Sequence, residues 1–262
     1  FAGEGTDTIE GKEGNDNLEG GAGADTFKIT SITDGNDTID GDTSSASADD
    51  TDIDTVDYSA LDNTHHLEVN LSSTAVGTIL ANKAVVTNGT TTLTDTLRNI
   101  ENIIGSNSGN DTISGDVNNN TLSGLGGDDL LSGNEGKDYI DGGNNNTSVG
   151  DTVSYDYVSS SNSVIVNLET QSGSVSASVT DIDALKFIEN VLGGKGNDSI
   201  TGDSANNTLD GNSGDDIVYG SGGSDRIIGG TQTSVDKVNY GATATTISSG
   251  IVLTTTAGTS FT

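Results

Sequence analysis

GGKGNDSIT, GDSANNTLD, GNSGDDIVY and GSGGSDRII are four consecutive nine-residue units that fill residues 193–228. In each unit, glycine, aspartate and other small polar residues dominate the first six positions, and a large apolar residue stands at the eighth. Glycine allows a positive φ, so the first part of a unit is predicted to be a turn. The last three residues are predicted to be a short strand, with the apolar residue inward and its neighbours outward.

Two units are predicted to complete one flattened coil, so that residues eighteen apart share an edge. Asp198 and Asp216 have this spacing, and we expect them to stack. Stacked strands lie about 4.8 Å apart, and calcium takes oxygen ligands at roughly 2.3 to 2.6 Å. The spacing therefore predicts a calcium ion midway between two stacked aspartates, with turn carbonyls completing its shell.

The pattern GGxGxDxUx, where U is a large apolar residue, resembles the calcium-binding nonapeptide of the RTX (repeats-in-toxin) family. Twelve units of this kind occur in three clusters. The resemblance implies an all-β fold, in which calcium-stabilised parallel β-roll (β-solenoid) clusters alternate with β-strand-rich spacers. It also implies several Ca²⁺ ions in rows along both edges of the roll.

The aspartate at the sixth position of each unit is the predicted calcium ligand. Asp7 and Asp25 are eighteen residues apart and are expected to share an ion. The full set is Asp7, Asp16, Asp25 and Asp37 in the first cluster, Asp111, Asp129 and Asp138 in the second, and Asp198, Asp216 and Asp225 in the third.

Two units depart from this pattern in the same way. Asparagine replaces the aspartate at Asn120 and Asn207, so the edges that they form with Asp138 and Asp225 are expected to bind calcium more weakly. Asp116 and Asp203, at the second position of the same units, are predicted to compensate in part and are the last two candidate ligands.

The composition agrees with a metal-binding chain. Acidic residues outnumber basic ones by 40 to 9, and the formal net charge is -31. This charge opposes a compact state unless cations bind, and about eight calcium ions would supply roughly +16. Without cysteine no disulfide can form, so metal would replace the cross-links of many extracellular folds. The few basic residues are scattered, which argues against nucleic acid as a partner.

A second, longer repeat separates the clusters. DTVDYSA, DTVSYDY and DKVNYGA begin at residues 54, 151 and 236, and an alternating strand pattern follows each of them, at residues 67–71, 164–168 and 250–254. The period-two pattern predicts strands rather than helices. Tyr58, Tyr155 and Tyr240 recur in this repeat and are predicted to pack against the end of the roll. The division that results is roll cluster 1–42, spacer 43–104, roll cluster 105–150, spacer 151–192, roll cluster 193–230 and the start of a third spacer at 231–262.

Few residues indicate catalysis. His65 and His66 are adjacent rather than three or four apart, as a zinc-binding helix requires, and are predicted to be surface polar residues. The acidic run 49–57 lacks the glycine of an EF-hand loop and is predicted to be a solvated turn. The sequence has no GxSxG, HExxH, phosphate loop or cysteine nucleophile. We therefore predict that the chain is not an enzyme.

The resemblance implies a calcium-dependent module of a large secreted or cell-surface bacterial protein, exported unfolded by type I secretion and folded outside on binding calcium. We expect a structural or adhesive role in an adhesin, surface layer or extracellular filament, with self-assembly or surface polysaccharide as possible partners. The alternative is the C-terminal RTX domain of a secreted hydrolase or toxin whose catalytic domain lies outside this chain. A carbohydrate-binding module is less well supported, because the chain has six tyrosines, four phenylalanines and no tryptophan.

No apolar stretch approaches about 18 residues, so no transmembrane segment is expected. The first residues resemble no signal peptide, and the chain begins inside a repeat, so we expect a fragment of a longer protein.

Overall fold

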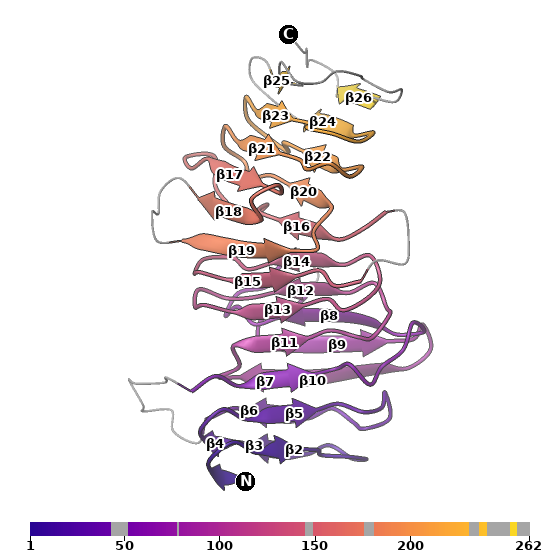
Figure 1. Cartoon of the computed structure of the whole chain (residues 1–262). Helices are drawn as coiled ribbons and strands as arrows, with labels where there is room; N and C mark the ends of the chain where they lie inside the picture. Colours follow the sequence, from indigo (N-terminus) through magenta and orange to yellow (C-terminus); the bar gives the residue numbers. More distant parts are fainter. Residues whose placement is uncertain are drawn as a thin grey trace.

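The structure is a computed structural model that describes residues 1–42, 52–77, 79–144, 149–175, 181–230 and 236–239, and the backbone of 252–255. Strands and turns form all of the regular structure in these ranges, without a helix. Two 12-stranded sheets face each other along one stack that runs from the N-terminal to the C-terminal end (Figure 1). The predicted all-β fold with parallel β-roll coils is confirmed.

The first sheet, sheet I, is mostly parallel. In spatial order it consists of β2 (Thr8–Ile9), β5 (Thr26–Lys28), β7 (Thr55–Asp57), β11 (Asn102–Ile104), β13 (Thr121–Ser123), β15 (Tyr139–Asp141), β19 (Ile182–Lys186), β18 (Ser172–Val175), β17 (Val164–Asn167), β21 (Ser199–Thr201), β23 (Ile217–Tyr219) and β25 (Lys237–Asn239).

The second sheet, sheet II, lies opposite and alternates with sheet I along the repeats. In spatial order it consists of β3 (Asn17–Glu19), β6 (Thr38–Asp40), β10 (Thr92–Arg98), β9 (Lys83–Thr87), β8 (His66–Asn70), β12 (Thr112–Ser114), β14 (Leu130–Ser132), β16 (Thr152–Ser154), β20 (Asn190–Leu192), β22 (Thr208–Asp210), β24 (Arg226–Gly230) and β26 (Val252–Thr255). A small pair, β1 (Gly3–Glu4) and β4 (Gly21–Ala22), lies at the N-terminal end.

The repeats stack in the predicted register. In the third cluster Ile200 pairs with Val218, and Leu209 pairs with Ile227, so residues eighteen apart lie side by side. Successive side chains of a strand point to opposite faces. The middle residue of each repeat strand therefore points inward, and its two neighbours point outward. The inward residues fill a single apolar core between the two sheets.

The spacers continue the same two sheets. In the first spacer β8, β9 and β10 form an antiparallel meander within sheet II, where β8 then pairs in parallel with β12 and β10 with β6. In the second spacer β17, β18 and β19 form the equivalent meander within sheet I. The two meanders therefore lie on opposite sides of the stack.

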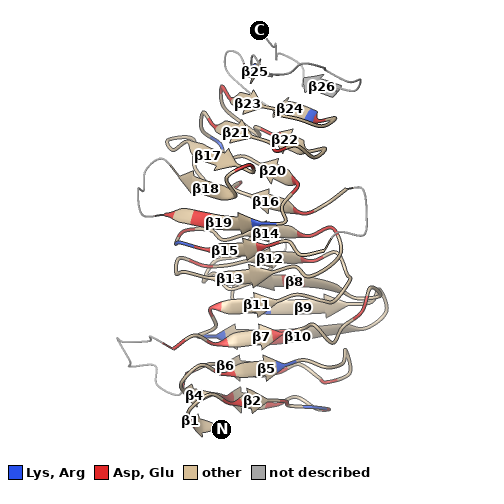
Figure 2. Ribbon diagram, viewed as in Figure 1, with Lys and Arg blue, Asp and Glu red and all other residues tan. Residues whose placement is uncertain are grey.

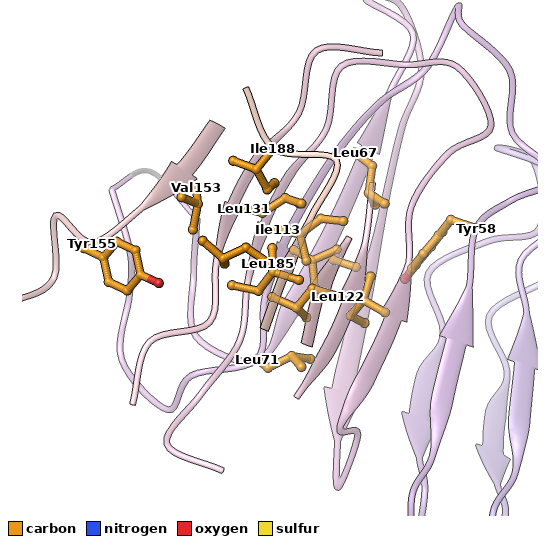
Figure 3. Close-up of a cluster of buried hydrophobic side chains, with 14 of the residues drawn as sticks. Tyr58, Leu67, Leu71, Ile113, Leu122, Leu131, Val153, Tyr155, Leu185 and Ile188 are labelled. Carbon is orange, nitrogen blue, oxygen red and sulfur yellow. The ribbon is translucent and has the colours of Figure 1, made fainter. Parts of the chain in front are cut away.

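Tyr58 and Tyr155 pack inside this continuous core rather than at an end of the roll. Both are almost fully buried, at 0% and 1% exposure, and Figure 3 shows them at either side of the apolar cluster that includes Ile113, Leu122 and Leu131. The predicted packing role of these two tyrosines is confirmed, but the predicted place was wrong. The spacer strands continue the two sheets, so the roll does not end at these tyrosines. Tyr240 lies outside the described residues.

Candidate metal sites along the two edges of the coil

Stacked carboxylates line each edge of the coil at the position two residues before an inward apolar residue. The backbone N–H of Asp198 donates to Oδ1 of Asp216 at 2.8 Å, and the N–H of Asp111 donates to Oδ1 of Asp129 at 2.7 Å. Asp7 and Asp25 are joined in the same way at 2.7 Å. Each carboxylate thus reaches back to the previous coil, which places it over the aspartate below.

We call these two series the aspartate ladders. The ladder beside sheet I contains Asp7, Asp25, Asp54, Glu101, Asn120, Asp138 and Asp183, and resumes after the second meander with Asp198, Asp216 and Asp236. The ladder beside sheet II contains Asp16, Asp37 and Asp95, and resumes after the first meander with Asp111, Asp129, Asp151, Glu189, Asn207 and Asp225.

The second carboxylate oxygen of many ladder residues is buried without a hydrogen-bond donor. Burying a charged oxygen without a partner is costly, so these atoms indicate places for a cation. The oxygens with this property include Oδ2 of Asp16, Asp25, Asp37, Asp129, Asp138, Asp216, Asp225 and Asp236.

Backbone carbonyls converge on the same places. A Cβ added to Gly105 would lie 2.7 Å from Oδ2 of Asp111 and 2.9 Å from the carbonyl oxygen of Gly124. A Cβ added to Gly193 would lie 2.7 Å from Oδ2 of Asp198 and 2.8 Å from the carbonyl oxygen of the glycine eighteen residues later. The first glycine of a unit therefore leaves room for a small oxygen-lined space.

Calcium suits this donor set. It takes six to eight oxygen ligands from carboxylates and carbonyls in flexible geometry. Across the described ranges no three His, Cys, Asp or Glu side chains gather at one point. An ion at these edges would therefore be held by carboxylates of neighbouring coils together with turn carbonyls, the arrangement that the repeat spacing predicts.

Burial strongly affects the protonation of these carboxylates. Loss of solvent, together with neighbouring acidic side chains, raises the pKa of Asp129, Asp138 and Asp216 to about 8, although backbone N–H donors oppose the rise. Burial also raises the pKa of Asp111 and Asp198, to about 6. A bound cation would favour the ionised forms.

The predicted ligands are not equivalent. Asp111 receives both the N–H and the hydroxyl of Ser106, and Asp198 receives the N–H of Gly194, so their carboxylates already have donors. Asp111 and Asp198 both lie in the first coil after a meander. The residue stacked on each of them from the meander is apolar and not acidic. Asp7 lies at the N-terminal end of its ladder and is only half-buried.

Asp116 and Asp203 lie beside the ladders rather than in them. Asp116 accepts the backbone N–H and the side-chain amide of Asn118, within its own turn. Asp203 accepts the N–H of Ala205 and the side-chain amide of Asn207. Their compensating role stays a prediction.

The two asparagines carry their own donor into the ladder. The amide of Asn120 donates to the carbonyl of Glu101 at 2.9 Å, and that of Asn207 donates to the carbonyl of Glu189 at 2.8 Å. In both cases an N–H group lies where a cation would otherwise face the oxygens. Weaker calcium binding at these positions therefore stays our expectation.

The sequence analysis missed seven acidic ladder residues. They are Asp54, Asp95, Glu101, Asp151, Asp183, Glu189 and Asp236. Each stands two residues before an inward apolar residue, as in DTV at 54–56 and DAL at 183–185. This two-residue spacing, without the glycines of the repeat, was the signal that could have found them.

The prediction of a solvated turn for the acidic run 49–57 is wrong at Asp54. Its side chain is 1% exposed and accepts the N–H of Asp25. Val56, two residues after Asp54, is fully buried in β7, whereas Ile53 is exposed. Residues 49–51 lie outside the described ranges.

Two ladder aspartates bind a tyrosine hydroxyl. Tyr58 donates to Oδ2 of Asp95 at 3.3 Å, and Tyr155 donates to Oδ2 of Asp183 at 2.8 Å. Both aspartates lie in the last strand of a meander, β10 or β19. At these two positions a side-chain hydroxyl is the donor to the second carboxylate oxygen.

The histidines lie at the surface and form local contacts. His65 contacts Asp62 at 2.9 Å, and His66 contacts Glu68 at 3.2 Å. Both pairs are partly exposed, in agreement with the predicted surface role.

The fold and the ladders together define a β-solenoid with carboxylates along both edges. The family model described as the RTX calcium-binding nonapeptide repeat (4 copies) matches residues 1–28, 102–130, 114–149, 187–218 and 201–233. The chain belongs to the RTX calcium-binding nonapeptide repeat proteins.

RTX repeats bind calcium and occur in extracellular proteins exported by type I secretion, so the chain is a calcium-binding module of this secreted bacterial class. The repeat itself is structural rather than catalytic. No curated protein matches the chain. Within the described ranges no helix is long and apolar enough to cross a membrane.

Proposed function

We propose that the chain is a calcium-dependent structural or adhesive module of an extracellular or cell-surface bacterial protein, such as an adhesin, a surface layer or an extracellular filament. The observation that carries this proposal is the series of buried carboxylate oxygens without donors, which runs along both edges of the stack. Every one of these groups joins one coil to the next. The chemistry of the ladders is therefore that of a cross-link, which suits a structural role.

Folding and metal binding are coupled by this arrangement. The turns bring carboxylates together, which is unfavourable until a cation arrives, so the binding energy of the ion becomes folding energy. Extracellular modules bind calcium with Kd of about 10⁻⁴ to 10⁻³ M. Such sites stay empty at cytosolic calcium levels and fill outside the cell, which agrees with export before folding.

The test is a calcium titration of the purified chain, followed by circular dichroism and sedimentation, with magnesium as the control. We expect β-structure to appear with calcium and not with magnesium, because magnesium demands near-ideal octahedral geometry and dehydrates reluctantly. Growth into regular assemblies would favour the layer or filament role. A calcium-folded monomer would favour an appendage of a secreted hydrolase or toxin. Full folding at pH 8 in the presence of a chelator would contradict the proposal.

A further inference from the structure

Both ladders continue from a repeat cluster into a spacer, where the sequence separation is no longer eighteen. Asp25 is joined to Asp54, 29 residues later, and Asp129 is joined to Asp151, 22 residues later. We infer that each spacer begins with a calcium site of its own, one held between Asp25 and Asp54 and the other between Asp129 and Asp151. The inference rests on the proposed calcium dependence and extends it to Asp54 and Asp151, which lie outside the residues matched by the repeat family.

The first junction gathers oxygens from four residues. Oδ2 of Asp25 is buried without a donor, and the side chain is 1% exposed. A Cβ on Gly20 would meet both this oxygen and the carbonyl oxygen of Gly41. A Cβ on Gly41 would in turn meet Oδ2 of Asp54 and the carbonyl oxygen of Asn99. Two carboxylates and two carbonyls therefore surround the start of the first spacer.

The second junction repeats this arrangement with other residues. Oδ2 of Asp129 is buried without a donor, at 2% exposure, and lies with the carbonyl oxygen of Gly142 beside Gly124. A Cβ on Gly142 would meet Oδ2 of Asp151 and the carbonyl oxygen of Phe187. The first junction belongs to the ladder of sheet I and the second to that of sheet II. The same set of two carboxylate oxygens and two carbonyl oxygens thus occurs at both junctions. The junctions lie on opposite edges, and the loops that lead into them differ in length.

At some other irregular ladder positions a group of the chain donates to the second oxygen, whereas in the described part of the chain Oδ2 of Asp25 and of Asp129 has no donor. Asp95 receives the hydroxyl of Tyr58, and Asn120 brings its own amide. Asp25 and Asp129 have no such group at Oδ2. Of the ion pairs in the described part of the chain, none includes Asp25 or Asp129. Two carboxylates with two carbonyls are the hard oxygen donors that calcium prefers.

Calcium at the junctions would pin each spacer to the repeats that precede it. Asp54 directly precedes β7, which pairs with β5, and Asp151 directly precedes β16, which pairs with β14. An ion that bridges the two aspartates holds these strand pairs together from the side. The spacers would then depend on calcium as the repeats do.

The experiment compares Asp54→Asn and Asp151→Asn with Asp57→Asn in the full chain. Asparagine keeps an oxygen for the backbone N–H and removes the charge. Asp57 is a matched control, because it lies on the same strand as Val56 but outside the ladder. Its carboxylate accepts the backbone N–H of Ser59. Equilibrium dialysis at saturating calcium is expected to show the loss of one ion in each ladder variant, two in the double variant and none in Asp57→Asn. An ion count and affinity equal to wild type in both ladder variants would overturn the inference.

A wild-type chain that binds no calcium would instead defeat the proposed function, so the two failures are distinguishable. If a ladder variant does not fold, crystals of the wild-type chain grown with calcium give the second measurement. Anomalous peaks between Asp25 and Asp54 and between Asp129 and Asp151 are expected. Peaks confined to the matched repeats would overturn the inference.

Discussion

At the scale of single residues, the chain alternates two ways of satisfying a buried carboxylate. At ladder positions such as Asp129, one oxygen accepts a backbone N–H and the other lies near a backbone carbonyl oxygen. At Asp95 and Asp183 a tyrosine hydroxyl supplies the second donor. The first kind leaves one oxygen open to a cation or a proton, whereas in the second kind both oxygens have a donor. The ladders therefore combine two kinds of link, which differ in whether the second oxygen has a donor.

Asp216→Asn is expected to lower stability in calcium more than Asp215→Asn. Asp216 is 0% exposed in the ladder, whereas Asp215 lies in the same turn beside it and is partly exposed. One ion present at a hundred times its Kd stabilises a fold by about 2.7 kcal/mol, and Asp216→Asn should lose an amount of this order. Thermal melts of both variants at 10 mM calcium measure the difference. Equal melting temperatures for the two variants would contradict a ligand role for Asp216.

At the scale of elements, the meanders show what the sequence could and could not predict. The eighteen-residue register and the inward apolar residues followed from the repeats, because period-two strands and fixed spacing leave one arrangement. The spacer strands were predicted near residues 67–71 and 164–168, and β8 and β17 lie there. The path of the chain through the spacers could not be predicted from the sequence, because a period-two pattern does not distinguish parallel from antiparallel strand partners.

The ladder residues of the spacers were missed for a related reason. Asp95 reaches its place in the ladder from 58 residues beyond Asp37, and Asp183 from 45 residues beyond Asp138. Only the completed meander brings them to the edge of the coil. The repeat aspartates, in contrast, are placed by local turns, and most of them lie where the pattern predicts.

Tyr155→Phe tests how the meander is held. The change removes the hydroxyl that donates to Asp183 at 2.8 Å and leaves a buried acceptor unsatisfied, which costs about 1 to 3 kcal/mol. Tyr219→Phe is the control, because Tyr219 ends β23 and lies partly exposed. Urea unfolding in calcium is expected to show the loss for Tyr155→Phe alone. Stability equal to that of the control would show that the hydroxyl is dispensable.

At the scale of the whole molecule, the acidic charge sets the conditions for folding. Figure 2 shows acidic residues spread along the stack, with few basic residues among them, and the formal net charge is -31. Self-repulsion of this size opposes the compact state. Cations or protons must therefore accompany folding.

Without calcium, acidification is expected to stabilise the fold. An unfolded aspartate has a pKa of about 3.9, whereas burial raises the pKa of folded Asp129, Asp138 and Asp216 to about 8. Between these values the folded state binds more protons, so its stability is greatest near pH 4 and falls as pH rises toward 8. Circular dichroism in chelator should show more β-structure at pH 5 than at pH 8.

Saturating calcium should reverse this trend, because protons then compete with the ion for the same oxygens. The calcium-loaded chain is expected to be more stable at pH 8 than at pH 5. A metal-free chain that is more stable at pH 8 than at pH 5 would show that the ladder carboxylates are solvated.

The direction of the ladders has a mechanical consequence. The strands lie across the stack, and the two described ends of the chain lie at its opposite ends (Figure 1). Tension applied between these ends acts along the hydrogen bonds that join one coil to the next, and loads them in series. Coils would then peel from an end one at a time, each at low force. An ion bound between two coils acts along the same line, so calcium would set the force at which the module yields.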